Sequence, residues 1–83
     1  MITIYGKPSC GFCTKAKNFA KDRLLEFEYK DVTNVQFLDE LKEKLPGVKS
    51  VPQIFINNDS IGGYTEFTSY VENTGYNGTG ETL

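Results

Sequence analysis

Two cysteines stand three positions apart near the beginning of the chain, in the segment Cys10-Gly11-Phe12-Cys13. Such a pair can exchange disulfides, form a structural bridge or supply ligands to a metal. A bridge that closes so small a ring would contribute only about 2 kcal/mol to stability. Two cysteines cannot fill a tetrahedral zinc site in one chain, so a half site would need a partner chain. The spacing therefore favours redox chemistry, with inert thiols as a further alternative.

The position of the pair predicts different roles for the two sulfurs. Cys10 would lie at the beginning of a helix, where unpaired backbone N–H groups and the helix dipole stabilise a thiolate. Cys13 precedes Ala16 by three residues and Ala20 by seven, so it belongs to the side of the helix predicted to be buried. We therefore predict that Cys10 is the exposed nucleophile and Cys13 the resolving thiol.

Two neighbouring residues are further candidates, each with an ordinary alternative. Lys7 precedes Cys10 by three residues, and its ammonium could stabilise a thiolate or pair with a substrate carboxylate. The alternative is an exposed lysine without a role. Phe12 begins the apolar stripe of the helix, so core packing competes with a role as an exposed ring beside the nucleophile.

The composition narrows the remaining chemistry. The chain has 83 residues, enough for one domain, and no histidine, which excludes Ser-His and Cys-His pairs and imidazole metal sites. The net charge is −2, yet residues 1–25 hold five basic residues and one acid around the two cysteines. That segment is either a solvated helix face or a local field that favours a thiolate and an anionic partner. With a pI of about 5.0, nucleic-acid binding is not expected.

We expect a cytoplasmic protein without a membrane partner. The first residues do not have the charged and then apolar pattern of a signal peptide. No apolar run approaches the roughly 20 residues of a membrane helix. In the reducing cytosol, cysteine pairs are more often redox-active or metal-binding than structural.

The apolar pattern predicts the element order βαβαββα, with the first two strands parallel. The expected strands are residues 2–5, 25–30, 53–56 and 60–61, the last two joined by a turn at residues 57–59. The expected helices are residues 12 to about 24, 35–45 and 65 to about 72.

The helix ends carry recognisable signals. Thr33 with Gln36 fits a capping box for the second helix, Pro46-Gly47 ends it, and Thr65 is a candidate cap for the third. The second helix is expected to place one apolar side chain per turn on a single face, at Val35, Leu38, Leu41 and Leu45.

Three motifs in this order and spacing resemble the glutaredoxin family, and in particular its small dithiol members from bacteria and bacteriophages. They are KPSCGFC at residues 7–13, SVPQIFI at 50–56 and IGGY at 61–64. The resemblance implies an α/β thioredoxin fold with a four-stranded mixed sheet flanked by three helices. It covers a domain of residues 1–72, and we expect residues 73–83, rich in Gly, Thr and Asn, to be a frayed tail.

The resemblance also implies a glutathione site beside a cis Val51-Pro52 bond. Lys7 would meet the glycyl carboxylate, and Val51 would pair its backbone with the cysteinyl unit of glutathione. Pro52 would keep the adjoining strand edge open, because proline has no N–H to contribute.

The γ-glutamyl end of glutathione would be held by Gly63, Tyr64 and Thr65, at the start of the last helix. A helix N-terminus suits a carboxylate for physical reasons as well. Phe12 and Gln53 are additional candidates from the same resemblance. The structural alternatives are a simple Gly-Gly turn and a cap at Thr65.

The activity implied by the resemblance is that of a monomeric, glutathione-dependent thiol–disulfide oxidoreductase. Its substrates would be protein disulfides and glutathione mixed disulfides, with ribonucleotide reductase as one protein partner, and no cofactor would be bound permanently. Thioredoxin reductase is the alternative electron source. Because Gly11-Phe12 stands where the commonest dithiol motif has Pro-Tyr, a second alternative is a dimeric [2Fe–2S] carrier that uses Cys10 and glutathione. A third is an interaction domain with inert thiols.

Overall fold

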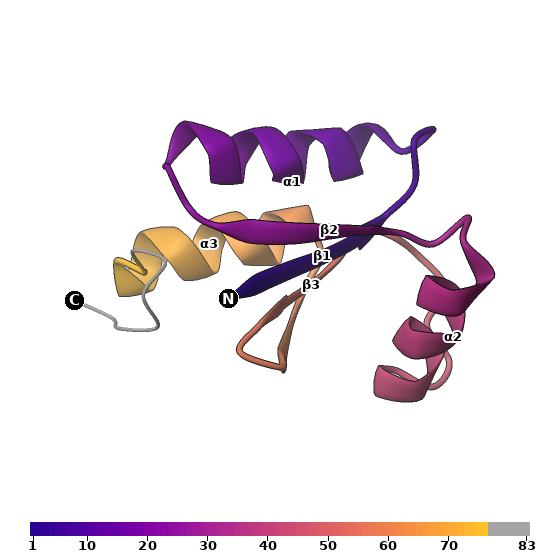
Figure 1. Ribbon diagram of the computed structural model, residues 1–83. Helices are drawn as coiled ribbons and strands as arrows, with labels where there is room; N and C mark the ends of the chain where they lie inside the picture. Colours follow the sequence, from indigo (N-terminus) through magenta and orange to yellow (C-terminus); the bar gives the residue numbers. More distant parts are fainter. Residues whose placement is uncertain (77–83) are drawn as a thin grey trace.

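The computed structural model describes residues 1–76 and shows a four-stranded sheet with helices on both faces (Figure 1). The elements are β1 (Ile2–Gly6), α1 (Gly11–Asp22), β2 (Phe27–Asp31), α2 (Val35–Lys44), β3 (Gln53–Ile56), β4 (Asp59–Gly62) and α3 (Tyr64–Thr74). The strands lie in the order β2-β1-β3-β4. β1 is parallel to β2 and antiparallel to β3, which is antiparallel to β4. The expected element order and mixed sheet are confirmed.

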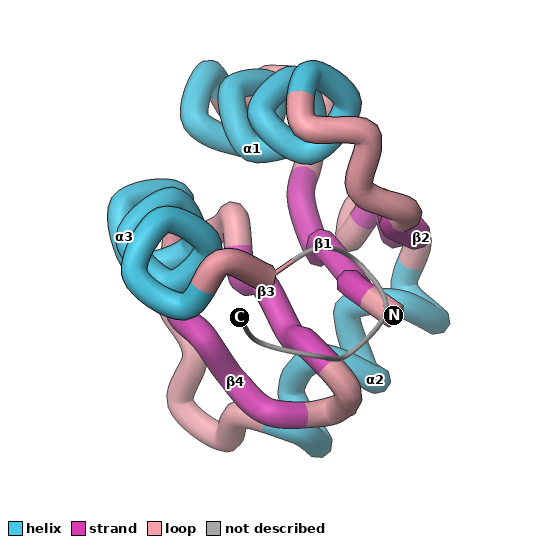
Figure 2. The backbone as a smooth tube through the Cα atoms, turned by 90° about the vertical axis from the view of Figure 1, so that its left-hand side faces the viewer, coloured by secondary structure: helices cyan, strands magenta, loops and turns pink. Residues whose placement is uncertain are grey.

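The central strand β1 divides its side chains between two apolar cores. Ile2 and Ile4 pack with residues of α1 and α3, whereas Tyr5 packs with Leu41 of α2. This division follows from the strand itself, because consecutive side chains point to opposite faces. Figure 2 shows α1 and α3 over one face of the sheet and α2 over the other. The end of β1 leads directly into the loop that precedes α1, where the cysteines lie.

The β3–β4 hairpin turns on two residues rather than the expected three. Asn57 and Asn58 have φ angles of 52° and 72°, and Ile56 pairs with Asp59. Two consecutive left-handed residues give the turn whose twist matches that of the flanking strands, and asparagine tolerates this conformation. β4 consequently begins at Asp59, one residue earlier than predicted.

β2 begins two residues later than predicted. After α1, Leu24 adopts a φ of 58° and is 89% exposed, while Leu25 is buried in the core shared with α1 and α3. The apolar character of Leu25 thus reflects packing of the connection and not membership of a strand.

The predicted cap of α2 is wrong by one residue. Asn34 is the N-cap, and its side-chain oxygen accepts a hydrogen bond from the Gln36 N–H at 3.0 Å. Thr33 instead donates from its N–H and hydroxyl to the Asp31 carboxylate. Val35 is 68% exposed and therefore does not share the buried face, where Leu41 is the fully buried residue.

The last helix extends past the expected domain boundary at residue 72. α3 ends at Thr74, Gly75 has a φ of 67°, and Tyr76 is buried against the core beside Tyr70. Residues 73–76 thus belong to the folded part, and the remainder of the predicted tail, residues 77–83, lies outside the described residues. Within residues 1–76, no helix combines the length and apolar character needed to cross a bilayer.

Candidate active site

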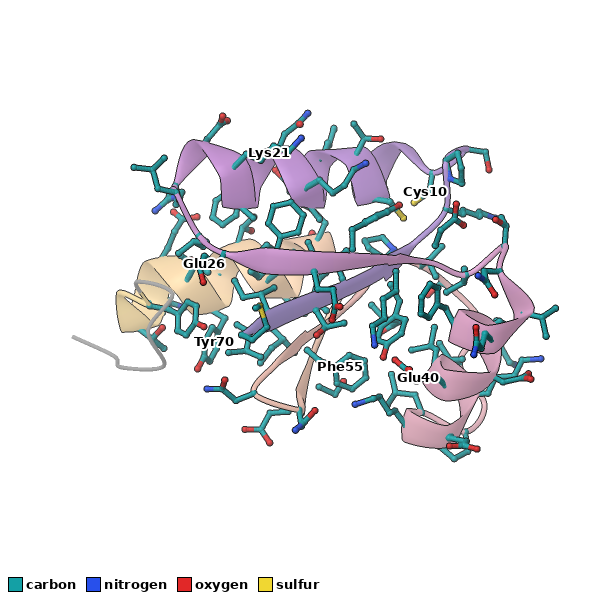
Figure 3. The ribbon with its side chains drawn as sticks, viewed as in Figure 1. Cys10, Lys21, Glu26, Glu40, Phe55 and Tyr70 are labelled. Carbon is teal, nitrogen blue, oxygen red and sulfur yellow. The ribbon has the colours of Figure 1, made fainter. Side chains whose placement is uncertain are left out.

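Cys10 is the N-cap residue of α1 (Figure 3). Its Sγ accepts a hydrogen bond from the Cys13 N–H at 3.1 Å, and its own N–H donates to the Lys7 carbonyl at 3.2 Å. An N-cap position normally carries a side-chain oxygen that satisfies one of the unpaired N–H groups of the first turn. Here sulfur occupies that place, so a negative charge on Cys10 would meet both a donated hydrogen bond and the positive end of the helix dipole.

Cys13 lies in a different environment, although it is only three residues away. It is fully buried, whereas Cys10 is partly exposed. Burial, together with a hydrogen bond to Cys10, raises the pKa of the Cys13 thiol to about 11. Gly6 makes room for this thiol, because a Cβ built there would lie 2.9 Å from the Cys13 Sγ. The difference between the sulfurs favours the predicted division into an exposed nucleophile and a resolving thiol.

Val51 brings a second backbone segment to the nucleophile. The Cys10 thiol donates to the Val51 carbonyl at 3.4 Å, a contact between residues 41 positions apart in the sequence. The Val51-Pro52 bond is cis, as the family resemblance implied, and β3 begins directly after it. The segment before β3 therefore runs beside the reactive sulfur.

Six of the seven residues predicted to bind glutathione line one groove of about 350 Å³, which we call the main groove. They are Phe12, Val51, Pro52, Gly63, Tyr64 and Thr65. The seventh, Lys7, lines an adjoining pocket of about 210 Å³, the α2 pocket, which shares Ser50 and Val51 with the main groove. The secondary candidate Gln53 also lines the main groove.

Phe12 is an exposed ring at the edge of the main groove and does not pack in the core. It is 57% exposed, and its ring centroid lies 6.0 Å from that of Tyr64. The Lys15 ammonium lies 5.0 Å from the same centroid, within range of a cation–π interaction. The two aromatic rings join the beginnings of α1 and α3, so they can supply an apolar wall for a ligand.

The beginning of α3 differs from the prediction, because Thr65 is not its cap. Gly63 is the N-cap residue, and the Glu66 carboxylate accepts a hydrogen bond from the Gly63 N–H at 2.9 Å. Glu66 also lines the main groove, and sequence reasoning missed it. The signal that could have found it is the spacing Gly63-x-x-Glu66, which is one half of a capping box.

The described residues do not offer a ready metal site. Within residues 1–76, no three His, Cys, Asp or Glu side chains gather closely enough to hold a metal ion. Iron–sulfur clusters need four ligands, mostly thiolates, whereas this chain presents Cys10 as its accessible thiol and buries Cys13. Any cluster would require ligands from outside the chain.

Comparison with known proteins identifies the family. The glutaredoxin family model matches residues 2–61. The chain belongs to the glutaredoxin family. Glutaredoxin from Vibrio cholerae is 38% identical over 82 residues, a match covering 89% of this chain and 94% of the relative. Such proteins are thiol–disulfide oxidoreductases, and this activity is consistent with the two thiols at the start of α1.

Solved structures support the same conclusion. The reduced Escherichia coli glutaredoxin superposes with a TM-score of 0.74 at 30% identity, covering 87% of this chain and 93% of that one. A buckwheat glutaredoxin in complex with glutathione has a TM-score of 0.72 at 18% identity, covering 87% and 68%. The predicted thioredoxin-like fold is therefore confirmed, and the glutaredoxin motifs quoted from the sequence lie around one site.

Proposed function

We propose that this glutaredoxin uses glutathione to reduce protein disulfides and glutathione mixed disulfides through Cys10 and Cys13. The observation that carries the proposal is the position of the Cys10 sulfur, which caps α1 and lies beside the Val51 backbone. Glutaredoxins as a family use glutathione as their reductant. The corresponding partners are disulfide-bearing proteins of the cytoplasm, with ribonucleotide reductase as a candidate, and the working unit is a monomer.

With a glutathione mixed disulfide, Cys10 alone carries the exchange. Its thiolate attacks the glutathione sulfur, forms a Cys10–glutathione disulfide and releases the substrate as a thiolate, which takes a proton from solvent. A second glutathione thiolate then attacks this disulfide. The products are oxidised glutathione and the Cys10 thiolate, so the protein returns to its starting state. One free glutathione has been consumed, and the other half of the oxidised glutathione comes from the substrate.

With a protein disulfide, Cys13 completes the exchange. Cys10 attacks one substrate sulfur and releases the other as a thiolate. Cys13 loses its proton to solvent and attacks the Cys10 sulfur, which forms the Cys10–Cys13 disulfide and releases the second substrate thiol. Two glutathione molecules then reduce this disulfide. The raised pKa of Cys13 keeps its thiol protonated at neutral pH before the exchange begins.

The main groove offers contacts for the rest of glutathione. The Val51 backbone would pair with the cysteinyl unit in the manner of an added strand, and Lys7 would meet the glycyl carboxylate. Gly63, Tyr64 and Thr65 would contact the γ-glutamyl end, with Phe12 and Pro52 as apolar walls. Because the Gly63 N–H already donates to Glu66, a ligand carboxylate at this end would use other N–H groups of the first turn of α3, such as those of Tyr64 and Thr65.

A coupled assay tests the proposed electron source. A glutathionylated peptide is the substrate, and NADPH oxidation is followed with glutathione plus glutathione reductase or with thioredoxin reductase alone. We expect NADPH oxidation in the first mixture and background rates in the second. Turnover with thioredoxin reductase in the absence of glutathione would contradict the proposal.

The Gly11-Phe12 spacer leaves an iron–sulfur carrier as a second candidate. In that role Cys10 would be one cluster ligand, and a second chain with glutathione would supply the others. Anaerobic reconstitution with iron, sulfide and glutathione decides between the two. A coloured dimer would support the carrier, whereas a colourless monomer would exclude it.

A further inference from the structure

The α2 pocket combines an apolar lining with two cations. Its aliphatic walls come from the loop after β2, from α2 and from the segment before β3, at Val32, Leu38, Leu41 and Val48. Lys7 and Lys49 also line it, and both are exposed. The other two lining residues are Ser50 and Val51. Every lining residue is thus aliphatic, basic or a serine. The pocket is therefore suited to a ligand in which an apolar group lies next to a negatively charged one.

The apolar lining is accessible surface and not sealed core. Leu41 is buried and packs with Tyr5 and Phe55, but Val32, Leu38 and Val48 are only half-buried. The volume of about 210 Å³ is smaller than the roughly 300–1,000 Å³ of pockets that hold cofactors and drug-sized ligands. A single aliphatic side chain is therefore a better match to this pocket than a whole small molecule.

The α2 pocket is continuous with the site of exchange. Ser50 and Val51 line both this pocket and the main groove, and the Val51 carbonyl lies 3.4 Å from the Cys10 Sγ. In the proposed function, Lys7 meets the glycyl carboxylate of glutathione, which is the part that follows the cysteine. A polypeptide whose cysteine is bound to Cys10 would therefore continue past Val51 into the α2 pocket.

We propose that the α2 pocket is a subsite for protein substrates, which selects the residues that follow the reactive cysteine. An apolar side chain within two positions of that cysteine enters the aliphatic part, and an acidic side chain beside it pairs with Lys7 and Lys49. The inference rests on the proposed function and adds no chemical step. It names the substrate class: disulfides whose reactive cysteine precedes an apolar–acidic pair.

Peptides with one internal disulfide test this subsite. Three peptides differ only in the two residues after the reactive cysteine, which are Leu-Glu, Leu-Gln or Ser-Glu. We expect kcat/KM to be about two- to fivefold higher for Leu-Glu than for Leu-Gln, the range of an exposed ion pair, and about tenfold higher than for Ser-Glu. Equal values for all three peptides would overturn the proposal.

Variants locate the effect. Lys49→Ala should reduce the advantage of Leu-Glu over Leu-Gln, whereas Lys21→Ala, in the last turn of α1 and far from Cys10 in Figure 3, should preserve it. Leu38→Ser should reduce the advantage of Leu-Glu over Ser-Glu. If the Lys49 and Lys21 variants lost the advantage of Leu-Glu over Leu-Gln equally, the effect would be one of general charge, and this would contradict a defined subsite.

A small substrate separates this inference from the proposed function. The mixed disulfide of glutathione and 2-mercaptoethanol meets the α2 pocket only at Lys7, through its glycyl carboxylate, and has no side chain for the aliphatic part, so Leu38→Ser should leave its reduction unchanged. If the glutathione-coupled assay fails for every substrate, the proposed electron source is wrong, and dithiothreitol as reductant still gives the peptide comparison. A peptide preference under dithiothreitol supports the subsite, and its absence there refutes it.

Discussion

The beginnings of α1 and α3 border the same groove but stabilise their first turns in different ways. Both have backbone N–H groups that lack partners within the helix. At α1 the partner is the Cys10 sulfur, and the first turn, Gly11-Phe12-Cys13-Thr14, is uncharged. At α3 the partner of the Gly63 N–H is the Glu66 carboxylate. One helix end thus presents a reactive atom, and the other carries a fixed charge.

This difference shows how two similar structural positions acquire different functions. At α1 the negative charge comes from Cys10 itself during exchange, where the helix end can stabilise it. At α3 the Glu66 carboxylate supports folding whether or not a ligand is bound. The four predictions that follow separate these two roles, beginning with the largest expected effect.

Replacement of the Cys10 sulfur should remove the activity. Cys10→Ser retains an N-cap side chain but has no nucleophilic thiolate, so exchange with any disulfide should fall to background. The matched variant Cys13→Ser should still reduce glutathione mixed disulfides and lose reduction of protein disulfides. Activity of Cys10→Ser equal to wild type, in the coupled assay, would refute the assignment.

The buried Cys13 thiol should make the protein less stable at alkaline pH. Because folding raises the pKa of Cys13 to about 11, this thiol ionises more readily in the unfolded chain, near pH 8.5. The free energy of unfolding therefore has its full value below about pH 8.5. It falls by on the order of 1–2 kcal/mol as the pH rises toward about 11.

Urea unfolding of wild type and Cys13→Ser between pH 7 and 10.5 measures this decline. The variant should lose less stability than wild type over the range. The raised pKa of Tyr5, which also results mainly from burial, affects both proteins alike. The pKa of Tyr29 is raised by burial and then by the charge on Cys13, so Tyr29 adds to the difference between the two proteins. Parallel pH profiles for the two proteins would show that Cys13 is not protected as described.

Loss of the Glu66 carboxylate should weaken folding more than exchange. Glu66→Ala removes the partner of the Gly63 N–H and should lower stability by about 1 kcal/mol. Glu66→Gln keeps an acceptor oxygen and should lose only the charge contribution, about 0.3–1 kcal/mol. Thermal unfolding compares the three proteins, and an order other than wild type, Gln, Ala would contradict the capping role.

An acid placed in the first turn of α1 should slow Cys10, because it would make this end resemble that of α3. A Cβ at Gly11 meets no atom of the neighbouring elements within 4 Å, so Gly11→Asp introduces no clash at this atom. We expect alkylation of Cys10 at pH 7 to slow by about two- to fivefold, with Gly11→Asn as the uncharged control. A faster reaction in the Asp variant than in the Asn variant would argue against helix-end activation.

Much of the fold was predictable because its apolar pattern is regular. The alternation in β1 and the stripe of α1 assigned both elements to within two residues, and the order of the elements along the chain was predicted as well. The residues that cap the helices were less predictable, because several neighbouring side chains can accept a hydrogen bond from the same backbone N–H. Thr33 was a reasonable cap, but Asp31 binds its N–H and hydroxyl, and Asn34 caps α2 instead.

The candidate site was predicted in a similar way. Motifs from three parts of the sequence identified six residues that line the main groove, although no local pattern brings Val51 near Cys10. That contact depends on packing of the segment before β3. For the same reason the sequence did not reveal the α2 pocket, whose lining residues come from α2 and from the loops that follow β1, follow β2 and precede β3.

The most direct test of the account is to trap the first covalent intermediate. Cys13→Ser is incubated with oxidised glutathione at pH 7, and intact-mass and peptide mass spectrometry locate the adduct. The account predicts one glutathione on Cys10, formed much faster than any adduct on Cys13 of the Cys10→Ser protein. Equal rates for the two variants, or a preferred adduct on Cys13, would contradict the claim that the end of α1 selects Cys10 as the nucleophile.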